Sequence, residues 1–218
     1  MGHLLPNRRW ARATNPARSH RLAEYVGLIL FAAAIPLPIS APAQVLTRPV
    51  NLAFLAPRAD LIIQGRVVEA RYEGLPSYPH VSTVLVTLEV ERMLRGPDTK
   101  RYTFRQYLPG GQRALKGDYT VGQRVLLFLP VPSSRGLSSP LALEQGHFRI
   151  VPDRSGQELI VNQRGNVGLF KDLPDTAARA GITLDEDHLR LVSRTRGAVP
   201  VGDFVSLVER LMLLPRNE

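Results

Sequence analysis

Hydrophobic and polar positions divide the chain into a region with a period of two and a C-terminal region with a helical period. From residue 60 to about 170, short runs alternate apolar and polar side chains and end at glycine or proline, which is typical of β-strands. The first runs cover residues 61–67 and 84–91, and a third covers residues 100–108. Residues 124–129 are apolar almost without interruption, so we expect a central strand that is buried on both faces. Residues 147–161 read as a hairpin around a polar turn.

The C-terminal region predicts two helices. Thr183 and Glu186 match a capping box, so we expect a helix that starts after Thr183 and runs to about Arg194. A second helix should begin near Pro200 and end near Leu214. Its apolar face is broad and consists of Val201, Phe204, Val205, Val208, Leu211 and Met212. A face this wide predicts docking against the sheet, although a helix that binds a partner or a membrane surface is the alternative.

Together these patterns predict a mainly β fold with C-terminal helices. We expect an OB-like curled antiparallel sheet or small barrel of five to seven strands, with two or three helices following it. The expected organisation is a signal peptide at 1–43, a β-barrel-like domain at 44–172 and a helical segment at 173–218 that packs on the barrel.

The first 43 residues have the organisation of a secretory signal peptide. A segment with five arginines precedes an apolar run at residues 25–35, and Pro36 and Pro38 then interrupt it. The sequence Ala41-Pro42-Ala43 offers the small residues that signal peptidase accepts, which makes Gln44 the expected mature start. We therefore expect an exported protein, periplasmic or extracellular, without a stable membrane span after cleavage, because a span needs about 20 apolar residues. An uncleaved N-terminal anchor is the alternative.

Charge and cysteine content narrow the function classes. The whole chain has a net charge of +9, but five basic residues and one acidic residue precede residue 44, which leaves +5 for the expected mature protein. The remaining basic residues are dispersed, so we expect no nucleic-acid partner. The chain has no cysteine, which excludes thiol nucleophiles, iron–sulfur sites and cysteine-rich zinc sites.

The search for catalytic motifs predicts no catalytic residue, no metal site and no cofactor. Serine-hydrolase, zinc-protease and nucleotide-binding motifs are all absent. The acidic residues around His188 are better explained as a helix cap than as a metal site. An exported hydrolase whose groups meet only in space remains open, with candidates Asp60, Glu69, Glu89, Glu91 and His147.

Two loops are candidates for a binding rim at one end of the sheet. The sequence-predicted binding residues in them are Gly110, Gly111, Arg113, Lys116, Gln145 and His147. The alternative is structural, with Pro109-Gly110-Gly111 as a strand terminator and Gly146 as a bulge. The favoured function is a non-enzymatic binding protein of the cell envelope, with an envelope protein, a peptide or a saccharide as its partner.

Several segments resemble a pattern found in small exported bacterial proteins of uncharacterised function. The matching segments are 59–60 with 63–67, then 90–96, 109–111, 121–129 and 145–148. The strand order is also similar to the netrin-like, OB-type barrel of the tissue inhibitors of metalloproteinases. That similarity implies a barrel and suggests a modulator of an envelope protease. Those inhibitors hold zinc through an N-terminal cysteine, which this chain lacks, so their mechanism transfers to no residue here.

If the signal peptide is cleaved as expected, N-terminal sequencing of the exported protein should begin at Gln44. Intact mass should show the loss of residues 1–43. A cell-associated protein that retains these residues would instead establish the anchor.

Overall fold

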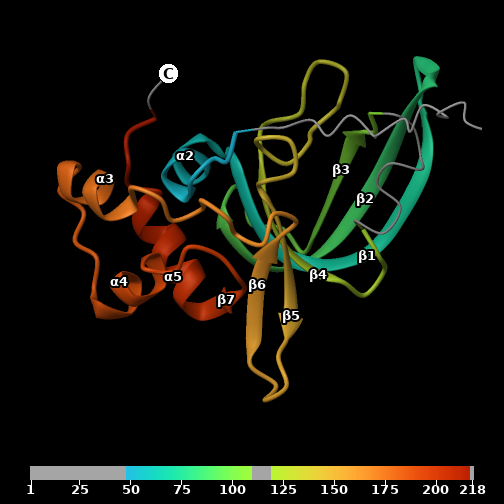
Figure 1. Ribbon diagram of the computed structural model, residues 1–218. Coiled ribbons are helices and arrows are strands. Elements are labelled where there is room, and N and C mark those ends of the chain that lie inside the picture. Colours follow the sequence, from blue (N-terminus) through green and yellow to red (C-terminus); the bar gives the residue numbers. More distant parts are fainter. Residues whose placement is uncertain (1–47, 110–118, 217–218) are drawn as a thin grey trace, which may run out of the picture. The chain divides into compact units, whose positions relative to one another are not determined.

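The computed structural model describes residues 48–109 and 119–216, and these form a mainly β fold (Figure 1). The strands are β1 (Leu61–Leu75), β2 (Tyr78–Arg95), β3 (Arg101–Tyr107), β4 (Arg124–Leu129), β5 (His147–Pro152), β6 (Glu158–Asn162) and β7 (Val199–Pro200). The helices are α2 (Leu52–Arg58), α3 (Leu173–Arg179), α4 (Glu186–Val192) and α5 (Val201–Leu211). All seven strands join one antiparallel sheet in the order β3-β2-β1-β4-β5-β6-β7. The predicted curled sheet with C-terminal helices is confirmed, and the sheet of the described residues is not closed into a barrel.

Strands β1 and β2 form a long curved ribbon (Figure 1). Both strands extend beyond the runs at 61–67 and 84–91 that the sequence predicted, because β1 continues to Leu75 and β2 already begins at Tyr78. Their register shifts at several points, one of them between Gln64 and Gly65. A Cβ atom at Gly65 would lie 2.5 Å from the carbonyl oxygen of Glu89, so only glycine lets the two backbones approach this closely. Such irregularities bend and twist a ribbon.

The sheet separates two apolar clusters, and β4 contributes to both. Leu126 and Phe128 belong to the cluster that contains the helices. Val125, Leu127 and Leu129 belong to the second cluster, which β1, β2 and β3 enclose. All five side chains are fully buried. The prediction that residues 124–129 form a strand buried on both faces is therefore confirmed.

Helix α5 packs against α2, α4, β6 and β7. Its apolar face is buried, and Phe204 packs against Phe148, which in turn contacts Phe128. The ring centroids of Phe204 and Phe148 are 5.0 Å apart. Docking of this helix against the sheet is thus confirmed, and its apolar face is unavailable to a partner or a membrane.

Arg95, at the end of β2, connects α2 to α5. Its Nη1 donates hydrogen bonds to the carbonyl oxygens of Ala56 at 2.7 Å and Ala59 at 2.8 Å. Its Nη2 donates to the carbonyl oxygen of Met212 at 3.2 Å. These carbonyl groups belong to the C-terminal ends of the two helices, where a cation is favourable. One side chain thereby fixes two helices that are more than 100 residues apart in the sequence.

Two features of the helices differ from the sequence-based expectation. The predicted cap at Thr183 is wrong, because the N-cap of α4 is Asp185, whose side chain accepts a hydrogen bond from the backbone N–H of His188 at 2.9 Å. Aspartate is as good a cap as threonine, and its charge also favours the helix N-terminus. Helix α2 was not predicted, although Asn51 caps it in the same way by accepting from Phe54 N–H.

Replacing Phe204 with alanine should lower the free energy of unfolding by about 3–5 kcal/mol, the range for removing a buried aromatic side chain. Leu213→Ala is the matched control, because Leu213 follows the same helix and is 71% exposed. Urea denaturation followed by circular dichroism measures both. Equal effects of the two substitutions would contradict the buried position of Phe204.

Candidate functional site

The structure describes two of the six sequence-predicted binding residues. Gly110, Gly111, Arg113 and Lys116 lie outside the described residues, so the first predicted loop remains a prediction. Gln145 and His147 are described, and both side chains are buried. They occupy the end of a tight turn that leads into β5.

This turn has an uncommon backbone. Ala142, Leu143 and Glu144 all have positive φ angles, of 56°, 51° and 72°. A left-handed conformation costs a non-glycine residue roughly 1–2 kcal/mol, and three in succession are rare. The turn is held by the hydrogen bond from Leu141 N–H to Phe128 O and by that from Gly146 N–H to Leu141 O. It directs the Glu144 carboxylate inward.

Four polar side chains gather beneath the turn, and we call them the polar cluster: Gln106, Tyr119, Glu144 and His147. Gln106 Nε2 donates to Glu144 Oε1 at 2.7 Å, and Gln106 Oε1 accepts from Tyr119 Oη at 2.7 Å. The His147 ring stacks on Tyr119 with a centroid distance of 4.8 Å and an interplanar angle of 5°. The Nδ1 atom of His147 lies 3.6 Å from Glu144 Oε2.

A carboxylate beside an imidazole is the pair that general acid–base catalysis uses. Here, however, only 2% of the His147 side chain is exposed and 17% of that of Glu144. No member of the polar cluster lines any of five well-formed pockets of the described residues. In this conformation the pair is buried within the described residues and lies at the turn that leads into β5. The sequence indicated His147 but not Glu144, because the left-handed turn that joins them has no glycine signal at 142–144.

Of the other carboxylates proposed for a hydrolase, Asp60 precedes β1, whereas Glu69 on β1 and Glu89 on β2 lie on neighbouring strands. Asp60 accepts a hydrogen bond from Val131 N–H and pairs with Arg216, each at 3.0 Å. Glu69 pairs with Arg71, and Glu89 is an exposed side chain on β2. Asp60 and Glu69 are thus each paired with an arginine.

Glu91 belongs to an ion-pair cluster with Arg66, Arg124 and Glu158. Arg124 donates from Nη2 to Glu91 Oε2 at 2.7 Å and also pairs with Glu158. Burial by itself raises the pKa of Glu91. Hydrogen bonds from Arg124 and Gln64 and the charges of Arg124 and Arg66 outweigh it, so the pKa of Glu91 lies below its ordinary value. These hydrogen bonds and ion pairs give Glu91 a structural role in joining β1, β2 and β4.

Gln145 connects the turn to the segment that precedes α2. Its Oε1 accepts from Val50 N–H at 3.0 Å, and its Nε2 donates to the carbonyl oxygen of Arg48 at 3.2 Å. Its own carbonyl oxygen accepts from Asn162 Nδ2 at 3.3 Å. Gln145 thus fixes residues 48–50 against the body of the protein and does not face solvent as part of a rim.

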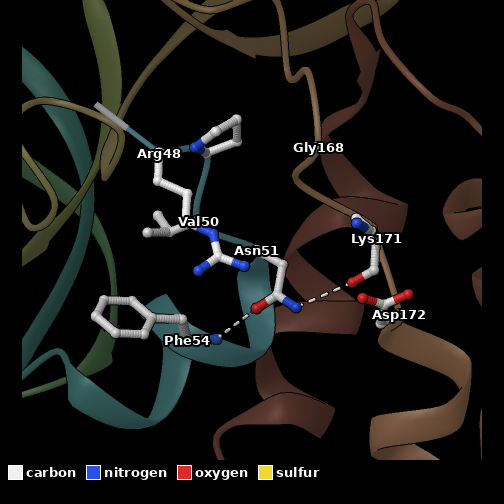
Figure 2. A pocket seen from close by; sticks show the side chains of 8 residues that line it. Arg48, Val50, Asn51, Phe54, Gly168, Lys171 and Asp172 are labelled. Atoms are coloured by element: carbon white, nitrogen blue, oxygen red, sulfur yellow. Dashed lines mark hydrogen bonds between the residues drawn. The ribbon is translucent and has the colours of Figure 1, made fainter. Parts of the chain in front are cut away.

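The segment held by Gln145 forms one wall of a pocket, which we call the α2–α3 pocket (Figure 2). Its volume is about 470 Å³. The lining residues are Arg48, Pro49, Val50, Asn51, Phe54, Gly168, Lys171 and Asp172. Asn51 joins the two walls, because its Nδ2 donates to Lys171 O at 2.9 Å while its Oδ1 caps α2. This size lies within the range of small-ligand sites.

The electrostatics of the α2–α3 pocket favour an anion. Figure 2 shows the Arg48 side chain extending toward Asn51 and Phe54. Neither Arg48 nor Lys171 forms an ion pair with an acidic residue of the described chain, and Asp172 is the only acid in the lining. Sequence reasoning missed these cations because about 120 residues separate the two walls and each cation alone resembles an ordinary surface residue.

Comparisons with known protein families, with curated proteins and with solved structures gave no match. Across residues 48–109 and 119–216, no three histidine or acidic side chains gather in a way that could hold a metal ion. No helix in the same part of the chain is long and apolar enough to cross a membrane. The site must therefore be interpreted from its own geometry.

The Glu91→Gln substitution should lower the free energy of unfolding by about 1 kcal/mol at pH 7, because it removes charged hydrogen bonds at a partly exposed site. Since the pKa of Glu91 is lowered in the folded protein, its stabilisation is complete above the unfolded pKa of about 4.3 and is lost as the pH falls through the folded value. The difference from the wild type should therefore shrink below about pH 4. Urea titrations at pH 7 and pH 3 measure it, and Glu69→Gln, which removes an exposed pair, is the control. A difference that is constant with pH would contradict this role.

Proposed function

We propose that this chain is an exported, non-enzymatic binding protein of the cell envelope and that the α2–α3 pocket is its binding site. The observation that carries the proposal is the presence of two cations, Arg48 and Lys171, that have no acidic partner among residues 48–109 and 119–216, in a pocket that also has an aromatic wall. A charged group left without a partner at a concave surface is available for a ligand of opposite charge.

The chemistry of the lining supports binding over catalysis. Arg48 and Lys171 are donors, Phe54 offers an apolar face, and both polar ends of the Asn51 side chain are already hydrogen-bonded within the protein. Among the described residues, no histidine, serine or threonine lines this pocket, and the one carboxylate in that lining, Asp172, has no neighbouring base or nucleophile there. Nucleophilic catalysis needs such a pair within hydrogen-bond distance.

An exported hydrolase is the second candidate, and one observation favours it. The Glu144 carboxylate and the His147 imidazole lie 3.6 Å apart and have unsatisfied atoms, which are Glu144 Oε2 and both ring nitrogens of His147. Their burial makes this candidate the weaker one, because a general base must come within hydrogen-bond distance of its substrate.

The proposal predicts where ligands contact the protein. Short peptides and oligosaccharides, each in neutral and anionic form, are titrated into isotope-labelled protein and followed by nuclear magnetic resonance. Backbone amide signals of Asn51, Phe54 and Lys171 should shift on binding. The double variant Arg48→Gln/Lys171→Gln should weaken the affinity at least about tenfold, the loss expected when charged hydrogen bonds are removed.

Two controls separate the alternatives. Arg149→Gln/Arg154→Gln removes the same charge from exposed positions on and beside β5 and should leave the affinity unchanged. Shifts that map elsewhere on the molecule would contradict the α2–α3 pocket as the site. Hydrolysis of any probe, abolished by Glu144→Gln or His147→Gln in a protein that still folds, would establish the hydrolase instead.

A further inference from the structure

A second pocket lies along α2 and α3, and its lining includes the C-terminal end of the described chain. It is lined by Ala53, Arg58, Thr176, Arg179, Ala180, Leu214 and Pro215 and has a volume of about 300 Å³. We call it the C-terminal pocket. Like the α2–α3 pocket, it takes part of its lining from α2, so the two pockets border the same short helix.

The two pockets meet at a stacked pair of side chains. Phe54 lines the α2–α3 pocket and Arg58 lines the C-terminal pocket. The Cζ atom of Arg58 lies over the Phe54 ring, 4.2 Å from its centroid, which is a favourable cation–π geometry. This pair connects one pocket to the other, and 37% of Phe54 is exposed to solvent.

Both pockets carry an excess of positive charge. Among the residues that the structure describes, Arg58 and Arg179 line the C-terminal pocket and no acidic residue does so. Arg48 and Lys171 line the α2–α3 pocket against the single carboxylate of Asp172. The two linings together present four cations and one anion. A ligand that occupies both pockets would therefore be favoured if it carried at least two negative groups.

The pockets also have apolar walls, and these distinguish between classes of anionic ligand. Pro49, Val50 and Phe54 line one pocket, and Ala53, Leu214 and Pro215 line the other. An acidic polysaccharide presents carboxylates and hydroxyl groups but few apolar groups to such walls. A peptide supplies carboxylate and apolar side chains along one chain, and clusters of arginine are a recurrent means of binding acidic peptide motifs.

We propose that the ligand is an acidic peptide segment that spans both pockets. It would place one carboxylate beside Arg48 and Lys171, another beside Arg58 and Arg179, and an apolar side chain on Phe54. Arginine binds a carboxylate through two parallel hydrogen bonds, which fixes direction as well as charge. This inference rests on the proposed binding function and adds the ligand class and a second subsite.

The test uses an array of synthetic ten-residue peptides. Each peptide has two glutamates separated by one to four residues with leucine or valine between them, and a matched array replaces both glutamates with glutamine. We expect the purified protein to bind members of the acidic array and not their glutamine counterparts. Fluorescence anisotropy then gives the affinity of the best peptide at 50 and 200 mM salt, and the affinity should fall as the salt concentration rises.

Variants assign each subsite separately. Arg48→Gln/Lys171→Gln and Arg58→Gln/Arg179→Gln should each weaken the best peptide at least about tenfold, while Arg149→Gln/Arg154→Gln should not. Replacing only one of the two glutamates should make one of the pocket variants neutral, because its partner on the peptide is gone. Thermal unfolding confirms that each variant is folded, and Arg58→Lys, which keeps the positive charge, should retain more affinity than Arg58→Gln.

Several outcomes would overturn the inference, and they differ from failure of the proposed function. Binding of the glutamine array as tightly as the acidic array would exclude an acidic peptide but retain a binding protein. The acidic peptide would also be excluded, and a binding protein retained, if no peptide binds but a uronate oligosaccharide does and Arg48→Gln weakens its affinity. Sensitivity to the first double variant alone would exclude the second subsite. If no probe of either experiment shifts the signals of the α2–α3 pocket, the proposed function fails as well.

Discussion

The burial of β4 on both faces is the constraint on which the rest of the structure depends. Its peptide groups have no access to water, so they must be paired within the sheet, and β1 and β5 provide that pairing on either side. Each face then needs an apolar cover of its own. The four helices cover one face, and the curved ribbon of β1 and β2 folds with β3 over the other. A single doubly buried strand thus determines both the curl of the sheet and the side on which the helices lie.

This division into two faces also separates the two kinds of polar chemistry. The polar cluster of Gln106, Tyr119, Glu144 and His147 lies by the cluster that the curled strands enclose, where its groups are buried. The cationic pockets lie among the helices, where α2 and α3 leave space at the surface. Gln145 links the two regions, because it follows Glu144 in the left-handed turn and fixes the segment of Arg48 and Val50. The pair of Glu144 and His147 is therefore connected through Gln145 to one wall of the α2–α3 pocket, although neither residue lines that pocket.

The sequence predicted those features that depend on the local pattern of apolar and polar residues. The apolar run at 124–129, for example, predicts a strand without a solvent-exposed face, and the structure has that strand. Where two nearby residues are both suitable helix caps, the sequence pattern does not distinguish them. The N-cap of α4 illustrates this, because it is Asp185 and not Thr183. His147 was singled out by its position, but Glu144 reaches it only through a turn that its residue types disfavour. The cationic pockets depend on tertiary contact between α2 and α3, and no local signal contains that information.

The four carbonyl groups that surround Arg95 have a consequence for motion. Three of them, at Ala56, Pro57 and Ala59, end α2 and its cap, and the fourth, at Met212, ends α5. If α5 lifted away, Arg95 would lose its bond to Met212 O, and the apolar contacts between α5 and α2 would be exposed to water. Local opening of either helix is therefore coupled to the other, so their amides should form one cooperative unit in hydrogen exchange. A molecule that binds to the surface of α2 would then slow the hydrogen exchange of amides in α5, near the C-terminal end of the chain.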